Sequence, residues 1–204
     1  GNAITFMMDY DNMPFIDAVE ELAKSAGLEV PKTQTPIGKK RAKDSASLYD
    51  LLEQAAGFFQ KMLREAPDKA VAVDYLKERG LTGDIASRYG VGYAPEGWNN
   101  LERHLGKSGD TPSKALEAGL YIQNEKGNIY DRFRHRIMFP IRDRRGRTIG
   151  FGARVLKKDE MPKYLNSPET PVFHKGQALY GLYESLQAHN KLKQVVFVEG
   201  YMDV

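Results

Sequence analysis

The sequence contains no cysteine among its 204 residues. A disulfide framework, a catalytic thiol and a zinc site with cysteine ligands are therefore excluded for this chain. The four histidines are scattered, and no two of them have the spacing of a metal-binding pair. We expect no zinc in these residues.

Long hydrophobic runs are missing as well. No apolar segment approaches the roughly 18 to 20 residues of a membrane-spanning helix, and no signal peptide opens the chain. Hydrophobic residues make up 41% and charged residues 28%, which excludes wholesale disorder. The length suits one large or two small domains. We expect a globular cytoplasmic protein, or a piece of one, that has no membrane partner.

An excess of one charge is absent overall but present locally. The formal net charge is only +3, which by itself implies no partner. Between Arg132 and Lys158, however, ten basic residues face a single acid, Asp143. Lysines and arginines that meet phosphates release condensed counterions, so this cluster favours a polyanion-binding surface. The alternative is a solvated surface hairpin.

Apolar periodicity divides the first half of the chain. Residues 15–26 have helical spacing, and Gly27 is placed to end that helix. Residues 31–47 lose the pattern and contain prolines and basic residues, which predicts an extended basic linker at a domain boundary. Further helices are expected over the following ranges: 48–63, 68–79, 82–87, a short one from 98, and 112–118.

The second half of the chain has the patterns of strands. Two hairpins are predicted, one from segments 120–122 and 128–130 and one from 136–142 and 147–155. Gly150 and Gly152 thin the last of these strands, which indicates the close approach of another backbone or a ligand.

A helix is expected over 179–189, and the apolar run Val195–Val198 is typical of a strand buried on both faces. Because the chain stops soon afterwards, we expect a truncated domain there. The fold class is therefore α+β, with a helical and antiparallel basic subdomain that leads into a truncated α/β domain.

An acidic residue follows the apolar run directly. Glu199 precedes Gly200, and ligands of α/β sheets bind outside the carboxyl ends of the strands. A carboxylate at this place suits a divalent metal or proton transfer, and oxygen ligands favour Mg²⁺ or Mn²⁺. A simple turn residue or helix cap is the alternative.

A proline-rich loop over residues 162–176 forms a second candidate site. It presents Lys163, Tyr164, Asn166 and Lys175. Lysine can meet phosphates, tyrosine can stack on a base, and asparagine can bond a base edge or a hydroxyl. Alternatively, the loop is a structured connection in which Tyr164 packs inward.

Several long motifs, in this order, resemble the bacterial DnaG-type primases. They are YDRFR at 130–134, IMFPIR at 137–142, IGFGAR at 149–154, PKYLNSPET at 162–170, LYGLY at 179–183 and VEGYMD at 198–203. One departure is Ala153, where the family usually has glycine. The resemblance covers nearly the whole chain.

The resemblance implies a division of the chain. Residues 1–30 resemble the tail of the family's zinc-binding domain, whose Zn²⁺ ligands would precede Gly1. Residues 31–47 correspond to the linker, and residues 48–190 to the amino-terminal basic subdomain of the RNA polymerase core. Residues 191–204 resemble the start of the toprim domain, whose Asp-x-Asp pair would lie beyond Val204.

The resemblance also implies roles for individual residues. Template- or nucleotide-binding positions are Arg79, Arg132, Arg134, Arg154, Lys163, Tyr164, Asn166 and Lys175. Glu199 corresponds to the catalytic carboxylate, and Glu199 with Asp203 would form part of a Mg²⁺ or Mn²⁺ site.

The implied activity is a DNA-directed RNA polymerase that makes short primers during replication. Its partners would be single-stranded DNA template, ribonucleoside triphosphates, the replicative helicase and single-strand-binding protein. We expect the fragment alone to be inactive. The alternatives are a non-catalytic basic module that binds single-stranded DNA, or another toprim-containing protein.

Overall fold

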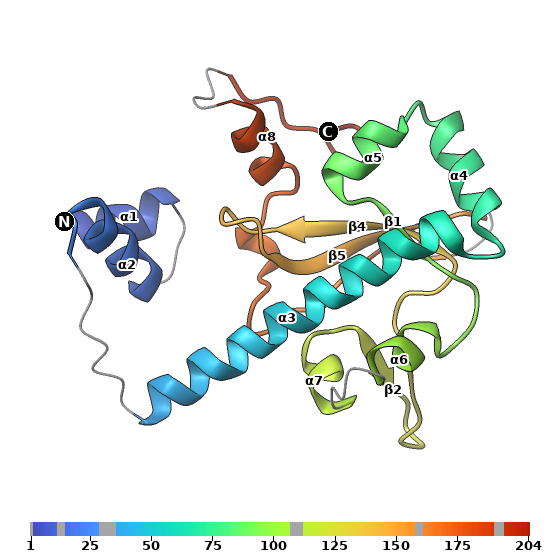
Figure 1. Ribbon diagram of the computed structural model, residues 1–204, viewed down its shortest axis with the longest axis horizontal. Helices are drawn as coiled ribbons and strands as arrows, with labels where there is room; N and C mark the ends of the chain where they lie inside the picture. Colours follow the sequence, from blue (N-terminus) through green and yellow to red (C-terminus); the bar gives the residue numbers. More distant parts are fainter. Residues whose placement is uncertain (1, 12–14, 29–35, 107–111, 158–160, 190–193) are drawn as a thin grey trace. The chain divides into compact units, whose positions relative to one another are not determined.

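The computed structural model describes residues 2–11, 15–28, 36–106, 112–157, 161–189 and 194–204, with the backbone alone at positions 9, 11 and 36–43. The regular elements among these residues are helices and antiparallel strands (Figure 1), which confirms the α+β fold class. The chain divides into two units, Gly1–Lys43 and Asp44–Val204. No described helix combines the length and the apolar composition needed to cross a bilayer.

The first unit contains helices α1 (Ala3–Asp11) and α2 (Phe15–Ser25). Helix α2 confirms the expected periodicity, and Gly27 follows it with a φ of 66°. The N–H of Leu28 donates to the carbonyl oxygen of Ala23 at 2.8 Å, which satisfies a carbonyl at the end of the helix. Helix α1 was not expected, because its apolar residues are consecutive and form no stripe.

Helix α3 (Pro36–Glu65) corrects the predicted linker. The expected extended conformation is wrong from Pro36 onward, where the backbone is helical. Proline suits the first position of a helix, where its missing N–H has no intrahelical partner, and the following lysines, arginine and alanines are strong helix formers. The first part of the expected linker, residues 31–35, lies outside the described residues.

The second unit is built on a four-stranded antiparallel sheet of strand order β1-β4-β5-β6. Its strands are β1 (Gly92–Ala94), β4 (Arg136–Arg142), β5 (Thr148–Val155) and β6 (Tyr164–Asn166). Strands β2 (Tyr121–Gln123) and β3 (Ile129–Asp131) form a separate hairpin. Both predicted hairpins are confirmed, whereas the three-residue strands β1 and β6 were too short for their pattern to predict them.

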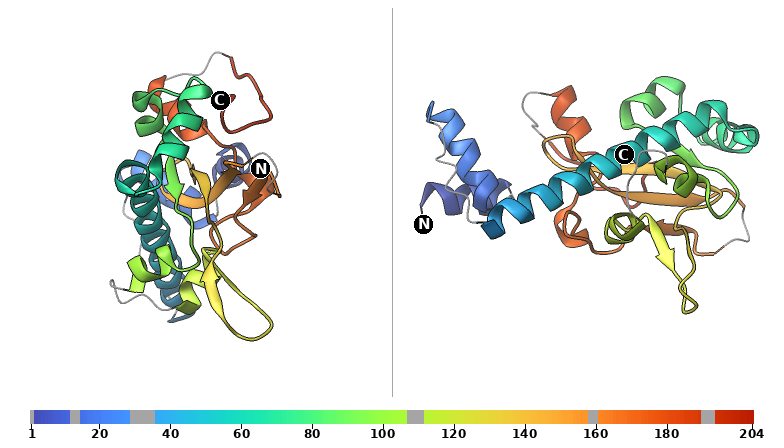
Figure 2. Two further views of the ribbon diagram at one scale, coloured as in Figure 1. Left: turned by 90° about the vertical axis from the view of Figure 1, so that its right-hand side faces the viewer. Right: turned by 60° about the horizontal axis from the view of Figure 1, so that its bottom comes forward.

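Helix α3 runs along one face of the four-stranded sheet (Figures 1 and 2). Met138 and Phe151 pack against it in one core cluster, whereas Ile137 and Phe139 belong to a second cluster with residues of α4. Side chains along β4 therefore alternate between two buried layers. The buried residues that α3 contributes are Leu48, Leu51, Leu52, Ala55, Ala56, Phe58 and Phe59.

A glycine brings α3 and the sheet close together. A Cβ at Gly92 in β1 would lie 2.6 Å from the carbonyl carbon of Phe59, closer than side chains allow. The absence of a side chain at this position therefore permits the observed distance between strand and helix.

The remaining helices are α4 (Lys69–Glu78), α5 (Gly83–Tyr89), α6 (Asn100–Leu105), α7 (Pro112–Glu117) and α8 (Leu182–Ala188). All five were expected. Thr82 caps α5, because its Oγ1 accepts from the N–H of Ile85 at 3.3 Å. Helices α4 and α5 lie on one side of α3, and α6 and α7 on the other (Figure 1).

The predicted strand at Val195–Val198 is wrong. These residues have no regular secondary structure, and Phe197 is 78% exposed. A strand exists only through hydrogen bonds to a neighbouring strand, and none of the described strands pairs with this segment. Apolar composition alone therefore does not make residues 195–198 a strand within the described part of the chain.

Candidate nucleic-acid interface

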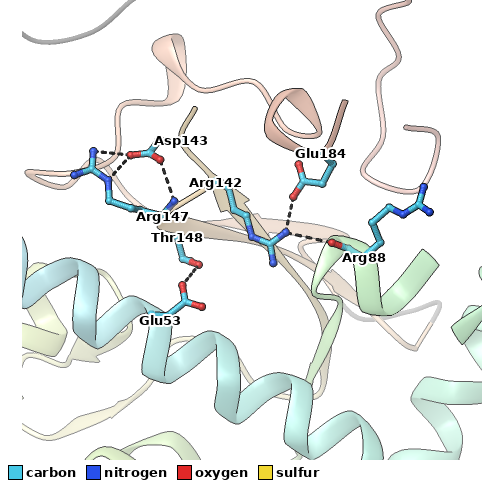
Figure 3. Close-up of polar contacts among 7 residues, drawn as sticks. All are labelled: Glu53, Arg88, Arg142, Asp143, Arg147, Thr148 and Glu184. Carbon is cyan, nitrogen blue, oxygen red and sulfur yellow. Dashed lines mark hydrogen bonds and ion pairs between the residues drawn. The ribbon is translucent and has the colours of Figure 1, made fainter. Parts of the chain in front are cut away.

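The basic cluster between Arg132 and Lys158 is largely occupied by contacts within the protein. Arg136 is buried and donates from Nη1 to the carbonyl oxygen of Pro162 at 2.9 Å. Arg142 donates to Glu184 Oε1 at 2.6 Å and to the carbonyl oxygen of Arg88 at 3.4 Å (Figure 3). These two arginines tie neighbouring elements to β4.

The turn between β4 and β5 is also held by its own charges. Arg147 donates to Asp143 Oδ2, while the backbone N–H of Arg147 donates to Asp143 Oδ1 (Figure 3). Its guanidinium also lies 4.1 Å from the ring centroid of Tyr49. The cluster is thus not one open basic surface, because several of its arginines stabilise the sheet.

Four alternating side chains form a continuous arrangement across three elements, which we call the cation–aromatic ladder: Arg79, Tyr75, Arg154 and Tyr164. The Arg79 guanidinium lies 5.4 Å from the Tyr75 ring centroid on α4. Arg154 on β5 lies 5.8 Å from Tyr75 and 4.8 Å from Tyr164 on β6. Distances within about 6 Å permit cation–π attraction.

Arg154 is the central member of the ladder and is only 7% exposed. Its Nε donates to the hydroxyl of Tyr75, and its Nη1 donates to the hydroxyl of Tyr164. No charged partner of Arg154 occurs among its described contacts. The hydroxyls and ring faces of Tyr75 and Tyr164 therefore stabilise the buried positive charge. The arrangement fixes Tyr164 at the sheet edge with 36% of its surface exposed.

Strand β6 places the neighbouring candidates. The carbonyl oxygen of Lys163 accepts from the N–H of Val155 at 3.1 Å, and the Lys163 side chain is exposed. Asn166 pairs with Gly152 of β5, and its Oδ1 accepts from the hydroxyl of Tyr201 at 2.8 Å. Tyr164 and Asn166 therefore lie on one short edge strand beside Arg154, and Lys163 directly precedes this strand.

Tyr201 extends this group toward the C-terminal segment. Its ring stacks on Phe139 at 5.2 Å between centroids and lies 6.1 Å from that of Tyr164. Burial raises the pKa of the Tyr201 hydroxyl, and the nearby Tyr164 adds to this. A Cβ at Gly152 would collide with the Tyr201 ring, so the predicted close approach to β5 is made by a side chain.

Two aromatic residues of this site, Tyr75 and Tyr201, were not predicted. Tyr75 lies one helical turn before Arg79, and this (i, i+4) spacing was the available signal. Tyr201 lies within the motif around Glu199, but no local pattern indicated that it reaches the sheet.

Arg134 and Arg132 make different contacts from the ladder residues. The Arg134 guanidinium lies 4.2 Å from the Trp98 ring centroid and 5.2 Å from that of Tyr130. Arg132 has a buried Nε with no hydrogen-bond partner among the described residues, and burial lowers the pKa of its guanidinium. Neither makes a described contact with the ladder.

Lys175 begins the short 3₁₀ helix η2 (Lys175–Gln177), and its side chain is exposed. Its backbone N–H donates to Glu169 Oε1 at 3.0 Å, and His174 Nδ1 lies 3.1 Å from Glu169 Oε2. The backbone N–H of Lys175 and then His174 lower the pKa of Glu169. The loop is thus held by contacts between its own residues.

Glu199 and Asp203 are both exposed. The N–H of Asp203 donates to the carbonyl oxygen of Gly200 at 3.1 Å, which forms a turn. Among the described residues, no three acidic, histidine or cysteine side chains cluster as metal ligands would. The carboxylates of the described residues therefore do not fit a complete Mg²⁺ site, which needs about six oxygen ligands.

Known proteins share this sequence and this fold. A family model described as the DNA primase catalytic core, N-terminal domain, matches residues 58–186. A DNA primase from Pseudomonas putida is 55% identical over 206 residues, which cover 100% of this chain and 31% of the relative. The DNA primase of Escherichia coli K12 is 45% identical over 205 residues, which cover 100% of this chain and 35% of the relative.

Solved structures give the same result. A DnaG primase catalytic domain bound to ssDNA matches with a TM-score of 0.75 and 46% identity, over 80% of this chain and 52% of that one. A DNA primase domain from Pseudomonas aeruginosa matches with a TM-score of 0.72 and 58% identity, over 77% and 49%. The chain spans about a third of the length of the curated relatives. It therefore belongs to the bacterial DnaG-type DNA primase family and contains the N-terminal domain of the primase catalytic core.

Proposed function

We propose that this chain is part of an enzyme that synthesises short RNA primers on a single-stranded DNA template. The observation that carries the proposal is the cation–aromatic ladder, which ends at Tyr164 beside the exposed Lys163. A single strand is bound by cations that contact phosphates and by aromatic faces on which bases stack. Both kinds of group meet at this sheet edge, and a related catalytic domain was solved bound to ssDNA.

The members of the ladder have different tasks in this proposal. Arg154 is too buried to track a flexible strand and instead holds Tyr164 by its hydroxyl. Tyr164 offers its exposed surface to a base or sugar, while Lys163 and Arg79 supply phosphate contacts from the surface. Asn166, Lys175, Arg132 and Arg134 complete the proposed template- and nucleotide-binding set.

The proposed reaction is attack of a ribose 3′-oxygen on the α-phosphate of an incoming ribonucleoside triphosphate, with release of pyrophosphate. We assign the catalytic carboxylate to Glu199, and we place Glu199 and Asp203 in a Mg²⁺ or Mn²⁺ site that needs further ligands. This chain alone is expected to make no primers, because its described carboxylates are too few for that site.

The proposal also assigns the regions of the chain and the partners of the enzyme. Residues 1–30 form the tail of the Zn²⁺-binding domain, 48–190 the basic subdomain, and 191–204 the start of the toprim domain. The replicative helicase and single-strand-binding protein are the expected protein partners.

Two variants of the full-length primase test the proposed function. Lys163→Ala and Tyr164→Ala should each lower primer synthesis at least about tenfold, as expected for a loss of about 1.4 kcal/mol of transition-state stabilisation. Lys163→Ala should also reduce the slope of log affinity for single-stranded DNA against log salt by about 0.7. Fluorescence anisotropy at several salt concentrations measures the slope.

A matched control comes from the β2–β3 hairpin. Lys126 is also exposed but lies in the turn of that hairpin, so Lys126→Ala should leave synthesis and salt dependence unchanged. Glu199→Gln should abolish synthesis and preserve DNA binding. Normal synthesis by the Lys163 and Tyr164 variants, or equal effects of the Lys126 control, would contradict the assigned surface.

A further inference from the structure

Residues 194–204 are held to the sheet by few contacts. None of the described strands pairs with them, and their apolar residues Val195–Val198 are exposed. Within this segment, Tyr201 stacks its ring on Phe139 of β4 and donates a side-chain hydrogen bond to Asn166 of β6. Tyr201 and Met202 both pack against the core cluster that contains Ile137 and Phe139, and Val204 lies close to Gly181.

Two independent sets of contacts fix the Tyr201 side chain. Its ring is nearly parallel to that of Phe139, at an interplanar angle of 9°, and lies edge-on to Tyr180 at 4.9 Å between centroids. The backbone of Gly152 lies so close to the ring that any side chain at this position would collide with it. The hydroxyl donates to Asn166, which fixes the rotation of the ring.

The fixed ring also determines where the neighbouring carboxylates lie. Glu199 precedes Tyr201 by two residues, and no contact of the exposed Glu199 side chain is described. The turn from Gly200 to Asp203 is compact, because a Cβ at Gly200 would collide with the Asp203 carboxylate. A displacement of Tyr201 therefore moves the backbone that carries both acids.

We propose that Tyr201 is a positioning residue, which places Glu199 relative to the nucleotide-binding strand β6. The inference rests on the proposed function of Glu199 and of β6. Asn166 on β6 accepts from the Tyr201 hydroxyl, and Tyr164 on the same strand lies against the Tyr201 ring. The strand that holds template or nucleotide and the segment that carries the carboxylate thus share one side chain.

The test uses full-length primase with the variants Tyr201→Phe and Tyr201→Leu. The first keeps the ring stacking and removes the hydrogen bond to Asn166, whereas the second removes both. We expect kcat for dinucleotide synthesis to fall about fivefold in Tyr201→Phe, the effect of one neutral hydrogen bond, and by more than tenfold in Tyr201→Leu. The KM for nucleotide and the Kd for single-stranded DNA should stay within twofold, since no binding group is removed.

The control is Tyr183→Phe on α8. Tyr183 is a half-buried tyrosine that packs near Gly146 and Arg142. Its hydroxyl has no described contact with Tyr201, so its removal tests the loss of a tyrosine hydroxyl elsewhere in the same unit. This variant should keep the kcat of the unmodified enzyme. A thermal unfolding profile for each protein separates loss of positioning from loss of folding.

The results separate this inference from the proposed function. An unmodified enzyme that makes no primers contradicts the proposed function itself. An active enzyme in which Tyr201→Phe and Tyr183→Phe have equal kcat overturns the positioning role, and so does a Tyr201→Phe effect confined to KM or Kd. If the Tyr201 variants do not fold, Gly152→Ala decides, because its added Cβ displaces the ring while none of the proposed binding side chains is removed. An unchanged kcat in folded Gly152→Ala protein overturns the inference.

Discussion

Replacing Glu184 by alanine should strongly destabilise the second unit. The Glu184 side chain is 4% exposed and pairs with Arg142, which is 16% exposed, at 2.6 Å (Figure 3). Glu184→Ala leaves the guanidinium with the carbonyl oxygen of Arg88 at 3.4 Å as its described acceptor. A nearly buried cation would then lack its counter-charge.

The expected magnitude follows from this burial. Removing one partner of a buried ion pair costs about 3–5 kcal/mol of unfolding free energy. For a unit of this size, each kcal/mol corresponds to about 2–4 °C, so the melting temperature should fall by roughly 6–20 °C. The control is the pair of Lys61 and Glu65, whose side chains are 53% and 58% exposed at 3.7 Å. Lys61→Ala should cost less than about 1 kcal/mol.

Urea and thermal unfolding followed by circular dichroism measure both variants. A double variant, Arg142→Met with Glu184→Met, should recover most of the lost stability, because well-packed apolar side chains replace a buried pair at little cost. If Glu184→Ala were no more harmful than Lys61→Ala, the pair would not be buried in solution, and the reasoning would be refuted.

Two further predictions concern stability. Burial raises the pKa of the Asp131 carboxyl to about 6. The stability that the protonated carboxyl contributes is therefore fully present below about pH 4 and is lost as the pH rises through about 6. Asp131→Asn should remove this pH dependence of the unfolding free energy in urea titrations, and a difference between the two proteins that does not change with pH would contradict the prediction. Gly92→Ala should lower the unfolding free energy by about 1–3 kcal/mol, because the added Cβ would collide with Phe59. Gly57→Ala on α3, where the Cβ enters open space, should raise the unfolding free energy by about 1 kcal/mol. Equal unfolding midpoints for the two variants would contradict the close approach of β1 to α3.

Helix ends and tight turns, which depend on interactions between residues close in the chain, were predictable from the sequence. Thr82 caps α5, Gly27 follows the end of α2, and the glycine turns close both hairpins. Such signals act over a few residues, so they are legible in the sequence. Lys163, Tyr164 and Asn166 were recognised as candidates for the same reason, since they follow one another in a loop with a restricted path.

Predictions from local pattern were wrong for segments whose conformation depends on residues far away in the chain. Val195–Val198 has the composition of a buried strand, but none of the described strands pairs with it. The composition around Pro36 favours an extended linker, whereas Pro36 begins a helix whose later turns pack on the sheet. Helical and strand conformations at such places depend on tertiary packing more than on intrinsic propensity.

The amino-acid sequence by itself determined the mixed fold class, most helices, both hairpins and the residue types from which an interface could be built. Only the tertiary structure decided which cations are available to a ligand. The basic cluster looked uniform, yet Arg142 and Arg147 pair with acids, and Arg154 lies between two tyrosines from other elements. Tyr75 and Arg154 are 79 residues apart in the chain and meet because α4 packs against the sheet. Hydrogen bonds and ring contacts at that separation depend on how helices and strands pack, and no local spacing encodes them.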